Sequence, residues 1–272
     1  MHLQQILRII EEHPREEFPI FDCERRFFTG LSNPQIITYD ELMHRNFSIP
    51  EREHDNLLQY FHDVHQTCGD DALAYYRPFH GQRNDWGIHI LEAGVDYLAT
   101  RIRDLAERDN INLSRLDVEY LAKQKLLLHE LGHHAVEISH SLLEISPEHP
   151  IRDSYRRHRA AKQNEQMLHE NCEAVCNWNV KKHKDKLKIR ALNHFNIISN
   201  FMLMQPNGYN DFGNITNRNF LESIGIRLQP GLPERHDLER EFKQHSKLSR
   251  LKPGSARSCI YGFAVPIYLI RT

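Results

Sequence analysis

The stretch LLLHELGHHAVE at residues 126–137 constrains this chain more than any other segment. His129, Glu130 and His133 stand in it among apolar side chains, a pattern typical of a buried α-helix. Helical residues four positions apart project from the same face, so His129 and His133 present two imidazoles side by side. One rigid helix can therefore supply two nitrogen ligands to a metal ion, with Glu130 within reach of a water bound to that ion.

Burial of these polar groups is unfavourable unless each finds a partner. Leucine, alanine and valine surround the motif, and two imidazoles and a carboxylate lose their hydration in such a setting. A metal ion compensates for that loss. Zinc is the natural candidate, because it accepts neutral imidazole and carboxylate ligands and leaves a fourth position open. The alternative is a pair of hydrogen-bonded core histidines on a purely structural helix.

The sequence LLHELGHHAVE resembles the active-site helix of the zincin metallopeptidases. The resemblance is close over this helix and loose over residues 86–180. It implies a helix-rich zincin-like core with a small sheet, in which zinc-bound water attacks a peptide carbonyl. It further implies that His129 and His133 hold Zn²⁺ and that Glu130 is the general base.

Zincins differ in their third metal ligand. The metzincin pattern requires a glycine where this chain has Val136 and a histidine where it has Ser139, so that pattern fails. His140 lies on the same helix, about 10 Å further along its axis than His133, which is too far to share the ion.

The gluzincin pattern fits better. Gluzincins take a glutamate from a second helix, often in the form Glu-x-x-small-(Asn or Asp). Glu173, with Asn177 four residues later, matches that form, whereas Glu170 matches less well because the residue three positions after it is not small. The resemblance therefore implies His129, His133 and Glu173 as ligands. Glu170 is the alternative ligand, and a third interpretation leaves both glutamates solvated.

Other side chains are expected to act indirectly. Tyr209, in the loop QPNGYNDFGN, is a candidate donor to the oxyanion that develops during hydrolysis. Glu137 is expected either to bond one of the metal-binding imidazoles or to be solvated. His134 is expected to be structural or to support the ligands, because its side chain points about 100° away from that of His133.

Two further features have ordinary interpretations. His169, Cys172 and Cys176 fall on neighbouring helical turns, so a separate Cys/His zinc site is an alternative to buried core cysteines. The basic run KKHKDKLKIR at 181–190 is expected to be a solvated helix face, with a nucleic-acid contact as the minor alternative.

Hydrophobic periodicity predicts a helix-rich α+β protein. Ser114 is expected to cap the motif helix, and the prolines of SPEHP at 146–150 to end it. Helices are predicted at 2–12, 53–66, 93–109, 115–144, 154–180 and 184–204, strands at 86–91 and within 258–270, and a loop at 205–214. The predicted parts are an irregular N-terminal lobe (1–75), a zincin-like catalytic core (76–204) and a C-terminal part that packs on the core (205–272).

Charge and cysteine content narrow the class of protein. The formal net charge of -2 lacks the basic excess typical of nucleic-acid-binding domains. Five cysteines, an odd number without a disulfide-scaffold pattern, indicate a reducing compartment. The N-terminus lacks the features of a signal peptide, and no apolar run is long enough to span a bilayer. A cytoplasmic protein is expected, or an effector delivered into a target cell.

Together these features predict a zinc-dependent endopeptidase that hydrolyses peptide bonds of an intracellular protein target. Its substrate is expected to pair as an extended strand along residues 86–91, by sheet-edge recognition. The alternative is a catalytically silent zincin-like binding protein or regulator, against which an intact Glu130 argues. Neither a membrane nor a nucleic acid is expected as a partner.

Overall fold

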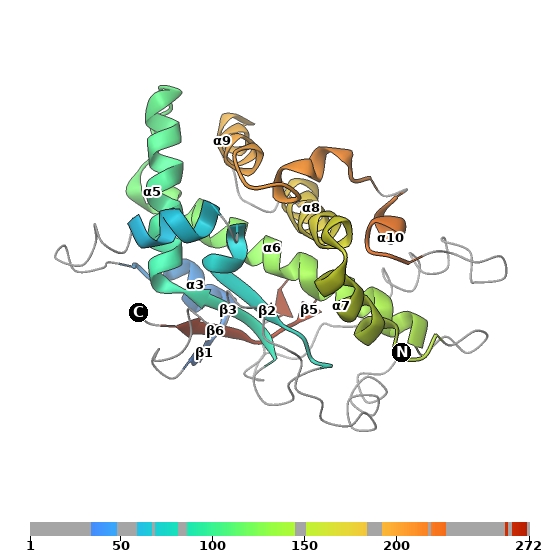
Figure 1. The fold of residues 1–272 in the computed structure, drawn as a ribbon. Helices are drawn as coiled ribbons and strands as arrows, with labels where there is room; N and C mark the ends of the chain where they lie inside the picture. The colour runs from blue at the N-terminus through green and yellow to red at the C-terminus, as the bar shows by residue number, and fades with distance from the viewer. Residues whose placement is uncertain are drawn as a thin grey trace.

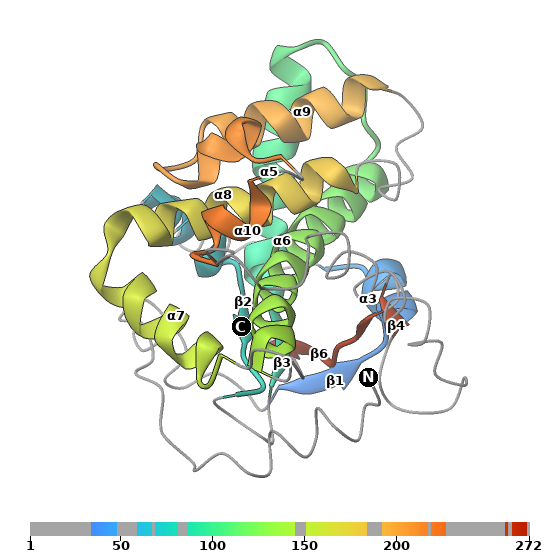
Figure 2. The same cartoon turned by 90° about the vertical axis from the view of Figure 1, so that its right-hand side faces the viewer.

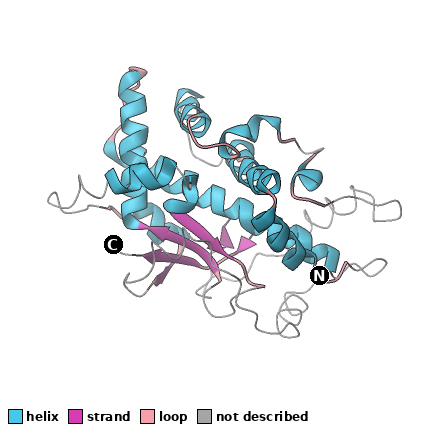
Figure 3. Cartoon of the chain, in the orientation of Figure 1, coloured by secondary structure: helices cyan, strands magenta, loops and turns pink. Residues whose placement is uncertain are grey.

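The computed structural model describes residues 34–47, 59–66, 69–80, 86–144, 151–183, 192–216, 219–226, 259–260 and 263–270. These residues are mostly helical and include one small four-stranded sheet (Figure 3), which confirms the predicted α+β class. The predicted helix at 2–12 lies outside the described residues, and residues 59–66 of the predicted helix at 53–66 are helical. None of the described helices is long and apolar enough to cross a membrane.

The four-stranded sheet joins distant parts of the chain. Its strands are β1 (Gln35–Ile37), β2 (Ala74–Arg77), β3 (Gly87–Leu91) and β6 (Ile267–Ile270), in the order β1-β6-β3-β2. β3 and β6 are parallel, and the other two pairs are antiparallel. The ring of His89 on β3 stacks between Tyr75 of β2 and Tyr268 of β6, with centroids 4.7 and 4.4 Å away. All three predicted parts therefore supply strands to one sheet, and the boundary between residues 75 and 76 falls inside β2.

The inner position of β3 overturns one prediction. β3 confirms the strand predicted at 86–91, but it lies between β6 and β2, so both of its edges are already paired. A substrate cannot add to it as a neighbouring strand, and the placement of substrate along residues 86–91 is wrong. The prediction fails because β6, from the far end of the chain, pairs with one edge of β3. The sequence around residues 86–91 does not reveal this pairing.

The predicted helices at 93–109 and 115–144 are confirmed. α5 spans Glu92–Arg108, and α6 spans Arg115–Glu144, as the periodicity predicts. Ser114 caps α6, because its Oγ accepts a hydrogen bond from the backbone N–H of Asp117 at 3.1 Å. The other described elements are α3 (Tyr39–His44), η1 (Gly69–Ala72), α7 (Ser154–Asn164), α8 (Gln166–Lys182), α9 (Leu192–Leu203), η3 (Tyr209–Asn214), α10 (Phe220–Ser223), β4 (Cys259–Ile260) and β5 (Phe263–Ala264).

The helix predicted at 154–180 is in fact two helices. Glu165 has an extended backbone, with φ -117° and ψ 101°, and it ends α7 and precedes α8. The chain changes direction there, so that α7 packs on both α6 and α8. No proline or glycine lies at the break. Tertiary packing, and not the local sequence, therefore decides where α7 ends.

The remaining C-terminal predictions hold in part. The helix predicted at 184–204 is described only from Leu192, as α9, and residues 184–191 lie outside the described residues. The loop predicted at 205–214 contains a 3₁₀ turn, η3, from Tyr209 onwards. β4, β5 and β6 confirm the predicted β-structure within 258–270.

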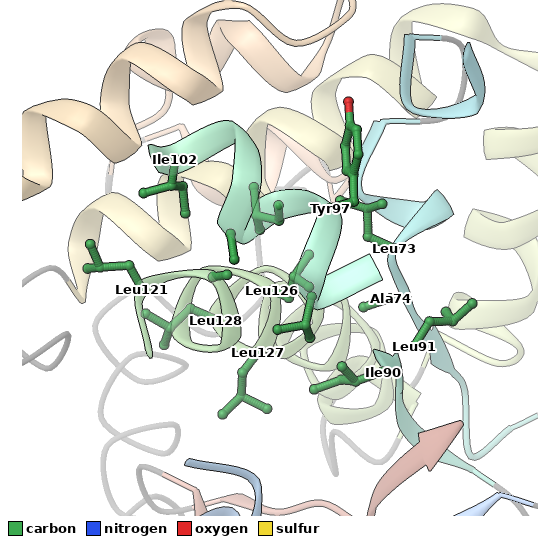
Figure 4. Close-up of a cluster of buried hydrophobic side chains, with 14 of the residues drawn as sticks. Leu73, Ala74, Ile90, Leu91, Tyr97, Ile102, Leu121, Leu126, Leu127 and Leu128 are labelled. Atoms are coloured by element: carbon green, nitrogen blue, oxygen red, sulfur yellow. The ribbon is translucent and has the colours of Figure 1, made fainter. Parts of the chain in front are cut away.

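α6 is the central rod of the fold. It packs on β2 and β3 on one side and on α8 on the other, with α9 beyond α8 (Figure 1, Figure 2). Leu126, Leu127 and Leu128 are consecutive and fully buried, so this part of α6 is covered on every side. Figure 4 shows these leucines beside Ile102 of α5 and Ile90 of β3. The polar motif that follows is therefore held on a rigid, buried helix.

Candidate metal centre

Two packed helices bring the predicted metal ligands together. His129 and His133 lie on α6, and Glu173 lies on α8, which crosses α6 (Figure 2). The close approach of the helices depends on Gly132, since a Cβ at this position would lie 2.7 Å from Cα of Cys176. The glycine of HELGH therefore has a packing role beside the two ligand positions.

Three buried atoms converge between these helices. Nε2 of His129 and Nε2 of His133 each lie 3.4 Å from Oε2 of Glu173. None of the three atoms makes a hydrogen bond among the described residues. Buried nitrogen and oxygen atoms rarely lack a partner, so three in one place indicate a cation site. In tetrahedral coordination with bonds of about 2.0–2.1 Å, ligand atoms lie about 3.3–3.4 Å apart, so these residues fit a zinc-sized ion.

A hydrogen-bond network sets the orientation of His129. Its Nδ1 lies 2.9 Å from Oδ1 of Asn177, an oxygen that can only accept, so Nδ1 donates. Nδ2 of Asn177 donates to Oε1 of Gln205 at 2.8 Å and to the backbone oxygen of Tyr209 at 2.7 Å, which fixes the amide. In the neutral ring the proton is therefore on Nδ1, and the lone pair of Nε2 faces Glu173.

Lys162 orients Glu173. Its Nζ donates to Oε1 of Glu173 at 2.7 Å, which leaves Oε2 directed at the two imidazoles. Burial raises the pKa of Glu173, but Lys162 and His133 outweigh burial and hold the pKa well below its usual value. Glu173 is therefore an anion, as a metal ligand must be. Lys162 belongs to α7, so the break between α7 and α8 is what delivers it here.

The surroundings of His133 favour positive charge. Burial lowers the pKa of His133, but Cys176, Glu173 and Asp71 together raise it well above its usual value. The carboxylates of Glu173 and Asp71 thus lie at Nε2 of His133, 3.4 and 3.5 Å away. Either a proton on this nitrogen or a metal ion beside it would supply the positive charge that the two carboxylates favour.

Glu130 lies beside the converging ligands without joining them. One of its carboxylate oxygens lies within 4.8 Å of a ring nitrogen of His129 and of a carboxylate oxygen of Asp71. Both of its oxygens are buried and make no hydrogen bond among the described residues. Burial raises the pKa of Glu130 well above its usual value, and Asp71 and Glu173 raise it further. A buried carboxyl with a raised pKa is typical of a general acid–base residue.

Sequence reasoning misses Asp71. This residue lies on η1, and its Oδ1 is 3.5 Å from Nε2 of His133. The neighbouring Asp70 is fully buried, pairs with Nζ of Lys125, and lies 3.3 Å from Nδ1 of His129 through Oδ2. Neither aspartate falls in a motif with the ligands, because η1 precedes the helix by more than forty residues and meets it only through the fold.

Tyr209 lies against one of the candidate ligands, His129. Its ring stacks on that of His129, with centroids 5.6 Å apart and planes 13° apart. Gly69 makes room for it, since a Cβ there would lie 2.4 Å from Cζ of Tyr209. Burial, followed by Asp71 and Glu173, raises the pKa of Tyr209 well above its usual value, so its hydroxyl keeps its proton. It can donate a hydrogen bond, and its role as oxyanion donor stays a prediction.

The other candidate ligands have partners elsewhere. Glu170 accepts from Nε2 of Gln166 at 2.9 Å on an exposed part of α8 and does not join the cluster. His140 pairs through Nδ1 with Oγ of Ser154 at 2.9 Å and through Nε2 with the backbone oxygen of Ile224 at 3.2 Å. Cys172 lies 3.6 Å from Nε2 of His158. The described residues therefore do not form a separate His169–Cys172–Cys176 site.

The basic run is described only at its start. Lys181 and Lys182 are exposed, which agrees with a solvated helix face, and residues 184–190 lie outside the described residues.

Glu137 differs from both of its predicted roles. It is fully buried, and its partners are not the imidazoles of His129 and His133. Tyr76 donates its hydroxyl to Oε2 at 2.5 Å, and Nδ1 of His80 lies 2.7 Å from Oε1. Nε2 of His80 lies 3.1 Å from Oε2 of Glu144. The Tyr76 hydroxyl is also 2.7 Å from Nδ1 of His134, which is thereby structural. This network ties the end of β2 to α6 one turn after the motif.

We expect the charge on His80 to make stability depend on pH. Burial lowers the pKa of His80, but its hydrogen bonds to Glu137 and Glu144 raise it overall from 6.5 to about 9. Protonated His80 therefore stabilises the folded state fully below about pH 6.5, and this contribution is lost as the pH rises to about 9. Over that range the free energy of unfolding should fall by about 3 kcal/mol through this residue.

Urea unfolding at pH 6 and pH 9 measures this dependence. His80→Gln is the matched variant, because its amide can still donate to Glu137 but does not titrate. Its free energy of unfolding should fall less over the same pH range than that of the wild type. Equal falls in the two proteins would show that His80 does not hold the extra proton.

A polar cavity borders the cluster at His133. Its volume is about 30 Å³, and Asp71, Tyr76, Lys162 and Arg159 are among its lining residues. β2, η1, α6, α7 and α8 all contribute to its walls. The cavity therefore gives one approach to the candidate ligands, from the side of His133.

This chain matches no known protein-family model, no curated protein and no solved structure. What it does must therefore be inferred from its own residues, and the converging atoms of His129, His133 and Glu173 are the strongest of these observations.

Proposed function

We propose that this chain is a zinc-dependent endopeptidase of gluzincin type, with a zincin-like core and an intracellular protein as its target. The observation that carries the proposal is the meeting of three buried ligand atoms without hydrogen-bond partners, from His129, His133 and Glu173. Asn177 and Lys162 support the ligands from outside, as partners of zinc ligands commonly do. A bound zinc ion supplies Lewis acidity, which polarises a carbonyl and allows water to lose a proton near neutral pH.

Glu130 is the proton carrier in this scheme. It accepts a proton from the attacking water and passes it to the nitrogen of the leaving amine. Its buried position without a hydrogen-bond partner leaves both oxygens available for that transfer. Glu130 would be ionised at the start of the reaction, because a cation bound beside it would lower its pKa, and its burial favours the protonated form that follows.

The substrate-binding surface is proposed to begin at β2. This strand is at an edge of the described four-stranded sheet, whereas β3 is not. Tyr75 and Tyr76 of β2 line the cavity together with His133. An extended peptide that pairs with β2 would therefore run past the metal ligands, and backbone pairing of this kind holds a peptide with little dependence on its side chains.

Tyr209→Phe is expected to lower turnover about a hundredfold while zinc content stays unchanged. The phenyl ring can keep the stacking on His129, whereas the hydroxyl that would donate to the oxyanion is lost. Zinc content and steady-state kinetics on a cleaved peptide measure the two effects separately. Unchanged turnover would remove Tyr209 from the catalytic residues.

A mixture of synthetic peptides tests the proposed activity without knowledge of the natural substrate. The zinc-loaded full chain should create new peptide termini, detected by mass spectrometry, and the Glu130→Gln variant should not. Chelation of the metal should stop the cleavage, and added zinc should restore it. The same termini with both proteins would indicate a contaminating protease, and no termini with either would contradict the proposed endopeptidase.

A further inference from the structure

Cys176 is a donor that the proposed three-ligand site does not use. Its Sγ belongs to the same group as donor atoms of His129, His133 and Glu173, all within 4.8 Å of one another. The side chain is fully buried, and the thiol is not in a disulfide. Cys176 follows Glu173 by three residues, so both project from one face of α8 towards α6.

The geometry points to a four-ligand site: we propose that Cys176 supplies a fourth protein ligand, so that two imidazoles, a carboxylate and a thiolate hold the metal in the resting protein. This inference rests on the proposed zinc site and adds to it. With zinc bonds of about 2.3 Å to sulfur and about 2.0–2.1 Å to nitrogen, a sulfur lies about 3.5 Å from a neighbouring nitrogen ligand. The spacing of the group accommodates that arrangement.

The buried atoms beside Cys176 also support this assignment. Nε2 of His129 and Oε2 of Glu173 are fully buried and make no hydrogen bond among the described residues, so they require a cation within the space that Sγ also borders. Gly132 allows the sulfur to reach this space, since a Cβ at residue 132 would lie 3.0 Å from Sγ. Cys172, one turn earlier, instead lies beside His158.

Coordination by Cys176 would remove the proton of its thiol and would fill the fourth position on the metal. As the sulfur–metal bond forms, the S–H bond breaks and its proton passes to the buffer. Four protein ligands leave no open position on a tetrahedral ion, which is the arrangement of closed zinc sites. Hydrolysis would then require water to displace the sulfur of Cys176 from the metal at each turnover, which would slow peptide cleavage without preventing it.

Cobalt substitution tests this ligand directly, because a thiolate bound to Co²⁺ produces a charge-transfer absorption in the near ultraviolet. The full chain, freed of metal and loaded with one equivalent of Co²⁺, should show this band. Cys176→Ser should lose it, and Cys172→Ser, the same change one turn away, should keep it. Cys176→Ala is the second variant if serine disturbs folding, since alanine is smaller beside Gly132.

The outcomes separate this inference from the proposed function. Cobalt bound by the wild type without the band would overturn Cys176 as a ligand and leave the three-ligand site standing. A band that survives in Cys176→Ser or Cys176→Ala would assign the sulfur to another cysteine and would also overturn the inference. A wild-type chain that binds no cobalt would overturn the metal site and Cys176 together.

Discussion

Glu130→Gln is expected to keep the fold and the zinc of the wild type and to lose peptide hydrolysis by about 10²–10⁴-fold. Glutamine has nearly the same shape as glutamate, so α6 should pack unchanged around the fully buried position. The amide cannot accept a proton from water, so the general-base step is lost. Glu130 is not one of the proposed ligands, and removal of its charge should therefore leave the metal in place.

Glu119→Gln is the matched control for this change. It lies on α6 about 16 Å before Glu130, and it pairs with Arg115 at 3.0 Å. The Glu119→Gln variant should hydrolyse peptides at the same rate as the wild type. A Glu130→Gln protein whose biological effect persists at full strength would favour the catalytically silent binding protein. If Glu130→Gln instead lost its zinc or unfolded, Glu130 would be a ligand or a structural residue, and the roles on α6 would have to be reassigned.

Glu173→Gln is expected to weaken zinc binding by more than about a hundredfold. Loss of a residue that only hydrogen-bonds a metal ligand commonly lowers metal affinity 10–100-fold. Glu173 is proposed to bind the metal itself, so its replacement should lower the affinity further. Glutamine is preferable to alanine here, because its amide oxygen can still accept a hydrogen bond from the buried Nζ of Lys162, which alanine cannot. His129→Ala and His133→Ala should likewise lose most of their zinc.

Glu170→Gln, three residues earlier on the same helix, provides the control for Glu173. Its carboxylate bonds Gln166 on an exposed surface, so zinc affinity should not change. Competition with a chromogenic chelator gives the affinity of each protein. Retention of zinc by Glu173→Gln together with its loss from Glu170→Gln would show that the wrong glutamate has been assigned.

The sequence predicts the parts of this site that follow from local spacing. His129 and His133 are separated by one helical turn, so their common face follows from helix geometry. α6 itself is predictable because its apolar pattern and the Ser114 cap both lie in one continuous segment. Glu173 and Asn177 are also local to each other, since both lie on α8 four residues apart, and the structure places Oδ1 of Asn177 2.9 Å from Nδ1 of His129.

The remaining parts depend on contacts between distant segments. Asp71 reaches His133 from η1, and Lys162 reaches Glu173 only because α7 and α8 are separate helices. Glu137 forms hydrogen bonds with His80 and Tyr76 because the end of β2 packs against α6. The inner position of β3 depends on a strand from the end of the chain. Spacing along the sequence carries none of this information, since each contact is decided by packing of the whole fold.

The zinc content of the purified chain tests the central claim most directly. The protein would be exposed to excess zinc, freed of loosely bound metal and analysed for metal and protein in the same sample. The proposed site predicts about one zinc ion per chain, because His129, His133 and Glu173 form one cluster of ligand atoms with zinc spacing. A folded wild-type protein that retains no zinc would contradict the metal site and the peptidase built on it.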